Sequence, residues 1–505
     1  MAVSQAATDV VPEPVRITAL HQRLAAAGQV LGITVEADDP TTGASLLYGR
    51  LVEHVHADEG TDGLWLLLTA LSAAMPDGDE LVAARRARDL HRSGDFGIWL
   101  LEATAAAAVS RGALDAEMDV VSDAVVVDVD FSARHRLHTG IQRVVRETVP
   151  RWAAEHELTL VAWTDQSGAT RHLLDDEADR VLRWHDLEDP GEDDGLQERQ
   201  HRLVVPWRSN VLLPENPPPE HCAVLAAMAV YSGNEVGLIG HDCIPVISPE
   251  LIHAGLPDRF TRYLETVKHA HRVVGVSASA AREFRGFTQM LGAQGLTGPE
   301  IAVCPLPVET PPGQAVPRQS PPLVVSIGSF EPRKNQLAVL HAAEHLWREG
   351  LEFSLMFIGG GGWVTEADSF FSRLKNAGRR VERATAISDS ELWRALRSAR
   401  FSMFTSLHEG FGLPVAESLA CGTPVLTSAY GSMAETAAAG GAVTVDPTDD
   451  LAIAAEMRRL LTDDALIDEL RRAAAARPPR TWDDYARQSW DALVPSPQTT
   501  AEVQA

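Results

Sequence analysis

A proline-rich segment divides this chain into two stretches that share one pattern. Before and after residues 309–322, short apolar runs alternate with glycine-containing loops and amphipathic helical segments. Such runs are typical of parallel strands that are buried on both faces. The sequence therefore predicts an α/β protein with two doubly wound, Rossmann-like domains in tandem. Ligands of such domains bind beyond the carboxyl ends of the strands, so we expect a site in the cleft between the two.

The chain before these two stretches has a different composition and sequence pattern. Residues 1–120 are rich in Ala, Leu and charged residues, follow a helical pattern and contain no catalytic motif, and the α/β pattern begins only at Asp123. We expect a mostly helical accessory module that serves in oligomerisation or in docking to a partner or a membrane surface. The predicted domains are a helical module (1–120), a first Rossmann-like domain (121–310), a second (311–480), and a C-terminal helix with a disordered tail (481–505).

Composition narrows the partners and the compartment. The formal net charge is −26, with 70 acidic residues against 44 Lys and Arg, which argues against nucleic acid because phosphate backbones require basic surfaces. The four cysteines are isolated in sequence, a usage that fits a reducing compartment. No signal-peptide pattern and no membrane-spanning apolar run is seen in the sequence. We therefore expect a cytoplasmic location, at the inner face of the membrane if it contacts one, with at most peripheral contact.

The strongest motif is the run H-E-G-F-G-L-P-V-A-E, which carries Glu409 and Glu417. It follows an apolar strand run, and its two glycines allow a close backbone approach. Pro414 suits the first turn of a helix, so free backbone N–H groups would face the loop and form an anion site. Carboxylates beside such a site can accept hydrogen bonds from the vicinal hydroxyls of a sugar or a ribose. Two solvated acids at a helix start would be the ordinary alternative.

A second motif is the pair Arg333–Lys334, which follows the strand run 323–327. The two cations lie at the strand end equivalent to that of Glu409, and they could neutralise a diphosphate leaving group. The ordinary alternative is an exposed basic pair. Asn335 comes next and is predicted to cap the following helix with its side chain.

With these motifs in view, residues 323–475 resemble the donor-binding domain of retaining, family 4 glycosyltransferases of the GT-B fold. Upstream, the run V-D-V-D-F-S-A-R-H-R-L-H-T-G-I-Q-R-V-V-R and the phrase G-H-D-C-I-P-V at 240–246 resemble bacterial O-antigen and polysaccharide mannosyltransferases. The resemblance covers about residues 123–493. It implies the GT-B fold, in which two tandem Rossmann-like domains face a cleft, here with an additional helical module at the N-terminus.

The resemblance also implies roles for the motif residues. Arg333 and Lys334 would bind the donor diphosphate and stabilise the departing nucleotide. Glu409 would contact hydroxyls of the donor sugar, and Glu417 would hold the hydroxyls of the ribose. The backbone of the loop between these carboxylates would lie near the sugar and phosphates, at Gly410, Phe411, Gly412 and Leu413.

Other positions are implied to complete the site. Ile387, within 386–388, would face the nucleobase, and Gly140 would lie where backbone passes close to the donor phosphate or the acceptor. His241 would line the cleft near the reacting sugar, although a buried core histidine is the alternative. Ser277 either faces the cleft or caps the helix after it. The candidate catalytic residues are His241, Glu409, Arg333 and Lys334.

The implied reaction is transfer of a sugar, with retention, from a nucleoside-diphosphate sugar to a hydroxyl of a saccharide, glycolipid or other glycoconjugate. The resemblance to bacterial O-antigen and polysaccharide mannosyltransferases favours GDP-mannose as the donor. We expect no metal and no other cofactor, because the donor domain has no Asp-x-Asp motif, and Asp128-x-Asp130 in the first domain is interpreted as structural. The alternatives are a non-catalytic GT-B binding or scaffold protein and a sugar-nucleotide epimerase.

Overall fold

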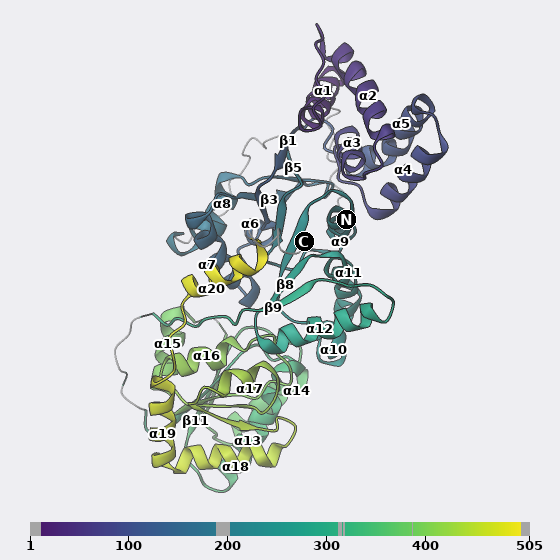
Figure 1. The fold of residues 1–505 in the computed structure, drawn as a ribbon. Helices are drawn as coiled ribbons and strands as arrows, with labels where there is room; N and C mark the ends of the chain where they lie inside the picture. Colours follow the sequence, from purple (N-terminus) through teal and green to yellow (C-terminus); the bar gives the residue numbers. More distant parts are fainter. Residues whose placement is uncertain (1–11, 188–201, 312–315, 317–318, 386, 496–505) are drawn as a thin grey trace, which may run out of the picture.

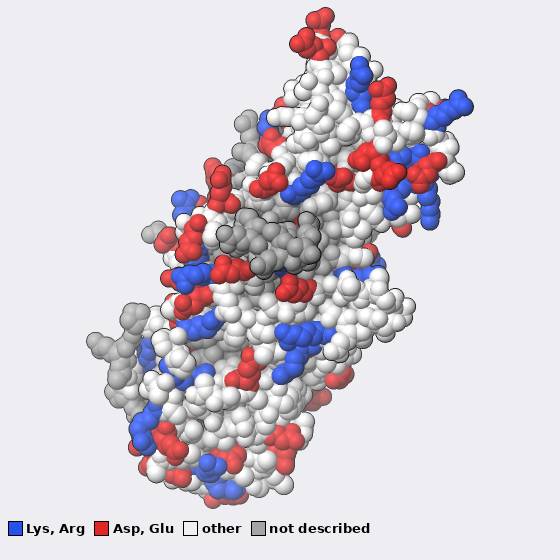
Figure 2. Space-filling model, in the orientation of Figure 1, with Lys and Arg blue, Asp and Glu red and all other residues white. Residues whose placement is uncertain are grey.

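The computed structural model describes residues 12–187, 202–311, 316, 319–385 and 387–495. Figure 1 shows three parts in a column: a helical part, a first α/β domain and a second α/β domain. On the face drawn in Figure 2, acidic and basic side chains are interspersed over all three parts. The described residues on this face form no basic stripe of the kind that follows a nucleic-acid backbone.

The helical part confirms the prediction of a mostly helical module. Its third helix is buried from Gly63 to Ser72, and the core of the module is continuous with that of the first sheet. Arg23, which is only 1% exposed, joins the two parts by donating to the carbonyls of Ala70, Leu114 and Ala116. The helices are α1 (Glu13–Val30), α2 (Pro40–Ala57), α3 (Asp62–Ser72), α4 (Gly78–Leu90) and α5 (Ser93–Ser110).

The α/β region begins earlier than the sequence pattern predicted. Strand β1 (Glu117–Ser122) precedes Asp123 and pairs in parallel with β5 (Arg202–Trp207), so the expected boundary at residue 120 falls inside a strand. The reason is that β1 is an edge strand, and only Met118 of its six residues is buried. A strand of this kind lacks the continuous apolar run on which the prediction relied.

The first sheet has nine strands in the order β1-β5-β4-β3-β2-β6-β7-β8-β9, and only β4 runs antiparallel to its neighbours. Its other strands are β2 (Val125–Asp128), β3 (Thr159–Trp163), β4 (Thr170–His172), β6 (Asn210–Leu213), β7 (Glu235–Gly240), β8 (Arg272–Gly275) and β9 (Glu300–Val303). The helices that follow these strands are α6 (Asp130–Arg134), α7 (Gly140–Glu155), α8 (Asp175–Leu182), α9 (Pro219–Tyr231), α10 (Ile244–Ile247), α11 (Leu256–His269) and α12 (Ala278–Gly292).

The second sheet has six parallel strands in the order β12-β11-β10-β13-β14-β15. The strand order reverses between β10 and β13, so the switch point where ligands bind lies at the carboxyl ends of these two strands. The strands are β10 (Leu323–Ile327), β11 (Ser354–Ile358), β12 (Val381–Ala384), β13 (Phe401–Phe404), β14 (Val425–Ser428) and β15 (Ala442–Val445). The helices are α13 (Gln336–Arg348), α14 (Thr365–Asn376), α15 (Asp389–Ser398), α16 (Leu413–Ala420), α17 (Gly431–Ala437), α18 (Asp450–Thr462) and α19 (Asp464–Ala475).

The last helix, α20 (Trp482–Leu493), crosses back to the first domain, where it packs against α7 and β8 (Figure 1). The indole Nε1 of Trp152 on α7 donates to the carbonyl of Ala486, 2.9 Å away. The predicted C-terminal helix thus completes the first α/β core. Residues 496–505, predicted to be a disordered tail, lie outside the described part of the chain. None of the helices in the described residues is long and apolar enough to span a membrane.

Candidate active site

The two α/β domains meet through the carboxyl ends of their strands. The Ser277 hydroxyl, after β8, donates to the carbonyl of Gly410 in the second domain, 2.6 Å away. The same hydroxyl accepts from the amide of Ala280, so Ser277 both caps α12 and faces the opposite domain. Glu435 of α17 accepts from the amides of Ala278 and Ser279 at the start of α12. The predicted interdomain site is therefore bounded by residues of both domains.

Glu409 lies in the loop after β13 and meets both predicted cations. Its Oε1 is 2.7 Å from Lys334 Nζ, and its Oε2 is 2.5 Å from Arg333 Nη1. The residue is 8% exposed, and burial by itself would raise the pKa of its carboxyl. The charges of Lys334 and Arg333 outweigh burial and hold this pKa below its ordinary value, so the carboxylate stays ionised. Two motifs far apart in sequence thus form one charged cluster at the switch point.

The loop that carries the cations is held against β13 by Asn335. Asn335 occupies the predicted N-cap position of α13, but its side chain bonds elsewhere. Asn335 has a left-handed backbone (φ 54°), makes no side-chain capping bond, and donates through Nδ2 to the carbonyls of Thr405 and Pro447 at 3.2 and 2.7 Å. The left-handed turn accounts for this difference, because it directs the amide toward the neighbouring strand ends instead of the helix N–H groups.

Glu417 lies inside α16, a helix that begins at Leu413 with Pro414 in its first turn. It is 6% exposed and forms an ion pair with Arg143 of α7, in the opposite domain. The sequence reasoning assigned no role to Arg143. The signal available was its place three residues after Gly140, in the run that resembles the mannosyltransferases. The expected ribose-binding carboxylate therefore already contacts a cation from across the cleft.

Glycines at this interface permit a close approach between the domains. A side chain at Gly410 would place its Cβ 2.3 Å from the carbonyl oxygen of His241, so only glycine fits. Gly412 has φ 88°, a left-handed conformation that favours glycine. Phe411 and Leu413 pack against the apolar core of the first domain, and a Cβ on Gly140 would lie 3.5 Å from Leu413. We expected both glycines to approach a ligand, but Gly410 approaches the backbone of the first domain instead.

His241 follows β7 and is 6% exposed. Its Nε2 lies 2.9 Å from the carbonyl of Pro214, and burial lowers the pKa of its imidazole to about 4. The ring is therefore neutral near pH 7 and donates through Nε2. The imidazole of His241 makes its hydrogen bond within the first domain, as expected of a buried core histidine. Its backbone carbonyl borders the loop at Gly410. Ile387 is half-buried against the apolar cluster around Trp393 at the start of α15.

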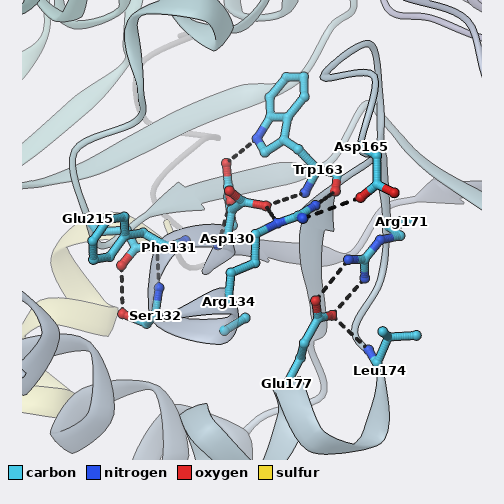
Figure 3. Close-up of polar contacts among 12 residues, drawn as sticks. Asp130, Phe131, Ser132, Arg134, Trp163, Asp165, Arg171, Leu174, Glu177 and Glu215 are labelled. Carbon is cyan, nitrogen blue, oxygen red and sulfur yellow. Dashed lines mark hydrogen bonds and ion pairs between the residues drawn. The ribbon is translucent and has the colours of Figure 1, made fainter. Parts of the chain in front are cut away.

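A second polar cluster lies at the carboxyl ends of β2, β3 and β6 (Figure 3). Asp130 Oδ1 accepts from the amide of Trp163 at 2.8 Å and from Arg134 Nε at 2.7 Å. Asp128 Oδ2 accepts from the Trp163 indole at 2.8 Å. Glu215 accepts from the amides of the first residues of α6, so these acids fix the loop after β2. Among the described residues, no group of three or more His, Cys, Asp or Glu side chains is placed to hold a metal.

Comparison with known families assigns the second domain. Residues 310–477 match the family model described as "Glycosyl transferases group 1". This domain is a group 1 glycosyltransferase domain. The match includes both cations at the end of β10 and both glutamates around the start of α16, so the charged cluster lies entirely within the matched region.

This chain is similar to two curated proteins that are named mannosyltransferases. It is 26% identical over 332 residues to the serotype-specific mannosyltransferase WbdA of Escherichia coli, covering 60% of this chain and 37% of that protein. It is 34% identical over 142 residues to the O-antigen chain mannosyltransferase B of Escherichia coli, covering 28% of this chain and 36% of that one. The chain thus spans little more than a third of the length of these curated relatives.

Among solved structures, the α,α-trehalose-phosphate synthase (UDP-forming) of Burkholderia xenovorans in complex with glucose-6-phosphate is 12% identical to this chain. The match covers 74% of this chain and 100% of that one, with a TM-score of 0.49. The assignment of the fold rests on the two sheets described above.

Proposed function

We propose that this chain is a retaining glycosyltransferase that moves a sugar from a nucleoside-diphosphate sugar to a hydroxyl of a saccharide or glycoconjugate acceptor. The observation that carries the proposal is the meeting of Arg333, Lys334 and Glu409 at the switch point of the second sheet. GDP-mannose is the first donor to test, because the two Escherichia coli relatives described above are named mannosyltransferases.

The proposed chemistry rests on charge rather than on a covalent nucleophile. Arg333 and Lys334 both pair with Glu409, and we propose that they share their charge with the diphosphate when it binds. Cations held in place at a buried site stabilise a developing negative charge strongly, which suits a departing nucleotide. The backbone N–H of Leu413 and the positive end of the α16 dipole would add to this stabilisation, and we propose that no metal is required.

The same contacts argue for a binding role of Glu409. A carboxylate that is paired with two cations, and whose pKa is held low, is a poor base and a poor nucleophile. We therefore propose that Glu409 positions the hydroxyls of the donor sugar, and that the leaving phosphate accepts the proton of the attacking acceptor hydroxyl on the same face. Because Nε2 of His241 donates to Pro214, its Nδ1 is the ring atom proposed to contact the sugar.

The nucleotide would occupy the side of the cleft nearer α16. We propose that Glu417 accepts from the ribose hydroxyls and that Arg143 moves from Glu417 toward the phosphates as it does so. Ile387 and its neighbours would face the base. We also propose a cytoplasmic location, where the four free cysteines would remain thiols, and a docking or oligomerisation role for the helical module.

The test is release of free nucleotide from GDP-, UDP-, dTDP- and ADP-sugars in the presence of mannosyl acceptors. Turnover of one donor is expected, and the double variant R333A/K334A should lose at least about a hundredfold in rate, because two charged contacts to the leaving group disappear. The matched control K375A/R394A removes two surface cations of the same domain. Wild-type rates and nucleotide affinity in R333A/K334A would contradict the proposed chemistry.

A further inference from the structure

Glu283 of α12 contacts both loops that border the candidate active site. Its Oε1 lies 2.8 Å from Nε2 of His408, which precedes Glu409 in the second domain. Its Oε2 accepts from the amide of Cys243, 2.7 Å away, in the loop after β7 that also carries His241. The Glu283 side chain is only 11% exposed. One buried carboxylate thus joins the His241 loop of the first domain to the Glu409 loop of the second, and the chemistry proposed above gives it no role.

His408 extends this connection to a cation of the site. Its Nδ1 lies 2.9 Å from the Ser248 hydroxyl, so both nitrogens of the ring contact the first domain. Its backbone carbonyl accepts from Nη1 of Arg333, 3.2 Å away, and the same Nη1 pairs with Glu409. The pair of Arg333 and Glu409 is therefore linked to the first domain through a single residue.

The charges around the imidazole of His408 stabilise its protonated form. Burial alone would lower the pKa of His408, but its hydrogen bond to Glu283 and three neighbouring carboxylates raise it above its ordinary value. A protonated ring donates from both nitrogens, to Glu283 and to Ser248, whereas a neutral ring donates from only one. The link is therefore strongest while the ring is protonated. The titratable and charged groups that surround the ring are Asp242, Glu250 and Glu283 of the first domain and Arg333, Glu409 and Tyr430 of the second.

This link acts where the two domains contribute different parts of the proposed site. Glu409 and Arg333 belong to the second domain, whereas His241 belongs to the first. Catalysis by positioning depends on how such groups are placed relative to one another, and a displacement of about 1 Å can cost about a hundredfold in rate. Because His408 is the neighbour of Glu409 in sequence, the contact with Glu283 acts directly on the loop that carries the carboxylate.

We propose that Glu283 is a positioning residue of the transferase and acts through His408 to hold Glu409 in place. Arg333 is held with them, because it pairs with Glu409 and donates to the carbonyl of His408. The inference rests on the proposed function, since the groups that are positioned are those proposed to bind the donor. Glu417, the proposed ribose ligand, lies outside this link, so the loss of Glu283 should act on turnover rather than on nucleotide binding.

The kinetic test uses nucleotide release by the full chain from the donor that it turns over. E283A and H408A should each lower kcat about ten- to a hundredfold, and calorimetry should give an unchanged Kd for the matching free nucleotide. The double variant E283A/H408A should lose no more than either single variant, because the two residues act in one chain of contacts. The control E265Q removes an exposed carboxylate of α11 and should behave as the wild type does.

H408Q separates the hydrogen bonds of His408 from its charge. The glutamine side chain can donate to Glu283 and accept from Ser248, so H408Q should recover most of the rate that H408A loses. In the wild type, the rate should fall as the pH rises through the raised pKa of His408, because the ring then loses one of its two donors. This fall should disappear in H408Q. A role confined to stability would lower the unfolding temperature and leave the pH profile unchanged.

The link can also be measured without turnover. Hydrogen exchange at Cys243 and in the peptide 405–410 should become faster in E283A, because the amide of Cys243 loses its acceptor and the Glu409 loop loses its contact with α12. NMR titration of the imidazole should show a lower pKa for His408 in E283Q than in the wild type, because the hydrogen bond and charge of Glu283 raise this pKa.

A wild-type kcat in E283A would overturn the proposal. So would additive losses in E283A/H408A, an equal loss of turnover and nucleotide affinity in E283A, or unchanged hydrogen exchange in that variant. If the chain turns over no donor but exchange rises in E283A, the positioning of the Glu409 loop stands and the proposed function fails. If the wild type and E283A turn over a donor equally well, the proposed function stands and the role of Glu283 fails.

Discussion

Replacing Glu215 with glutamine should remove part of the pH dependence of the stability of the first domain. Glu215 is 7% exposed, and burial raises the pKa of its carboxyl to about 7 (Figure 3). Its Oε1 accepts from the amides of Phe131 and Ser132, and its Oε2 lies 2.7 Å from the Ser132 hydroxyl. Glutamine can keep this arrangement, because its Oε1 accepts from the same amides and its Nε2 donates to the hydroxyl.

The sign and size of the effect follow from the two pKa values of this carboxyl. Its pKa is about 7 in the folded protein and has the ordinary value of 4.5 in the unfolded chain. Between these values the folded state holds a proton that the unfolded state has released, so the free energy of unfolding falls as the pH rises. The stabilisation that this proton provides is fully present below pH 4.5 and is lost as the pH rises through 7. A difference of this size corresponds to about 3 kcal/mol.

The assay is urea unfolding of the wild type and E215Q at pH 5 and pH 8. Hydrogen exchange of peptides around Phe131 identifies the transition that belongs to the first domain, since a chain of several domains does not unfold in one step. The stability of E215Q should exceed that of the wild type by up to about 3 kcal/mol at pH 8, with most of this difference absent at pH 5.

Asp128 provides a contrasting variant. Burial and the charge of Asp130 raise the pKa of Asp128 to about 7 as well, but its two oxygens accept from the Trp163 indole and the Asp130 amide. Asparagine has only one acceptor oxygen for these two donors, so D128N should be destabilised at both pH values by about 1–3 kcal/mol. Equal pH profiles for wild type and E215Q, or a loss of stability in E215Q at pH 8, would refute the reasoning.

Three further outcomes are expected at the donor site. E417A should weaken binding of GDP about ten- to a hundredfold by calorimetry, because a charged acceptor for the ribose hydroxyls is lost, and an unchanged Kd would remove that role. E409A should lower kcat and reduce the discrimination among donor sugars more than it weakens the binding of free nucleotide. An E409A variant that loses only nucleotide affinity would show that the roles of Glu409 and Glu417 are exchanged. EDTA should leave the rate of nucleotide release unchanged, and a loss restored by Mg²⁺ or Mn²⁺ would show that a metal supports the leaving group.

The strands that the sequence revealed are those buried on both faces. β10 coincides with the apolar run expected at 323–327, since a central parallel strand needs apolar residues at every position. β1 and β9 at the sheet edges were not found, because they leave most of their residues partly exposed. β5 was also missed, although it is buried. Its run contains Pro206, which argues against a strand, and its position beside β4 near the edge accommodates the missing N–H.

The sequence alone determined the local parts of the site. The spacing of Glu409, Pro414 and Glu417 places one carboxylate on a strand-exit loop and the other inside the helix, because turns and helix starts depend on residues a few positions apart. Likewise, the Arg333–Lys334 pair could be placed at a strand end from its neighbours. The resemblance to a known family then supplied their expected roles.

Only the tertiary structure decided which of these parts meet. The contacts of Glu409 with Arg333 and Lys334 depend on the adjacency of β10 and β13, which are separated by two other strands in the sequence. The pairing of Glu417 with Arg143 depends on how the two domains face each other. Neither relation is encoded in local periodicity, because strand order and domain approach are set by the packing of whole sheets and helices.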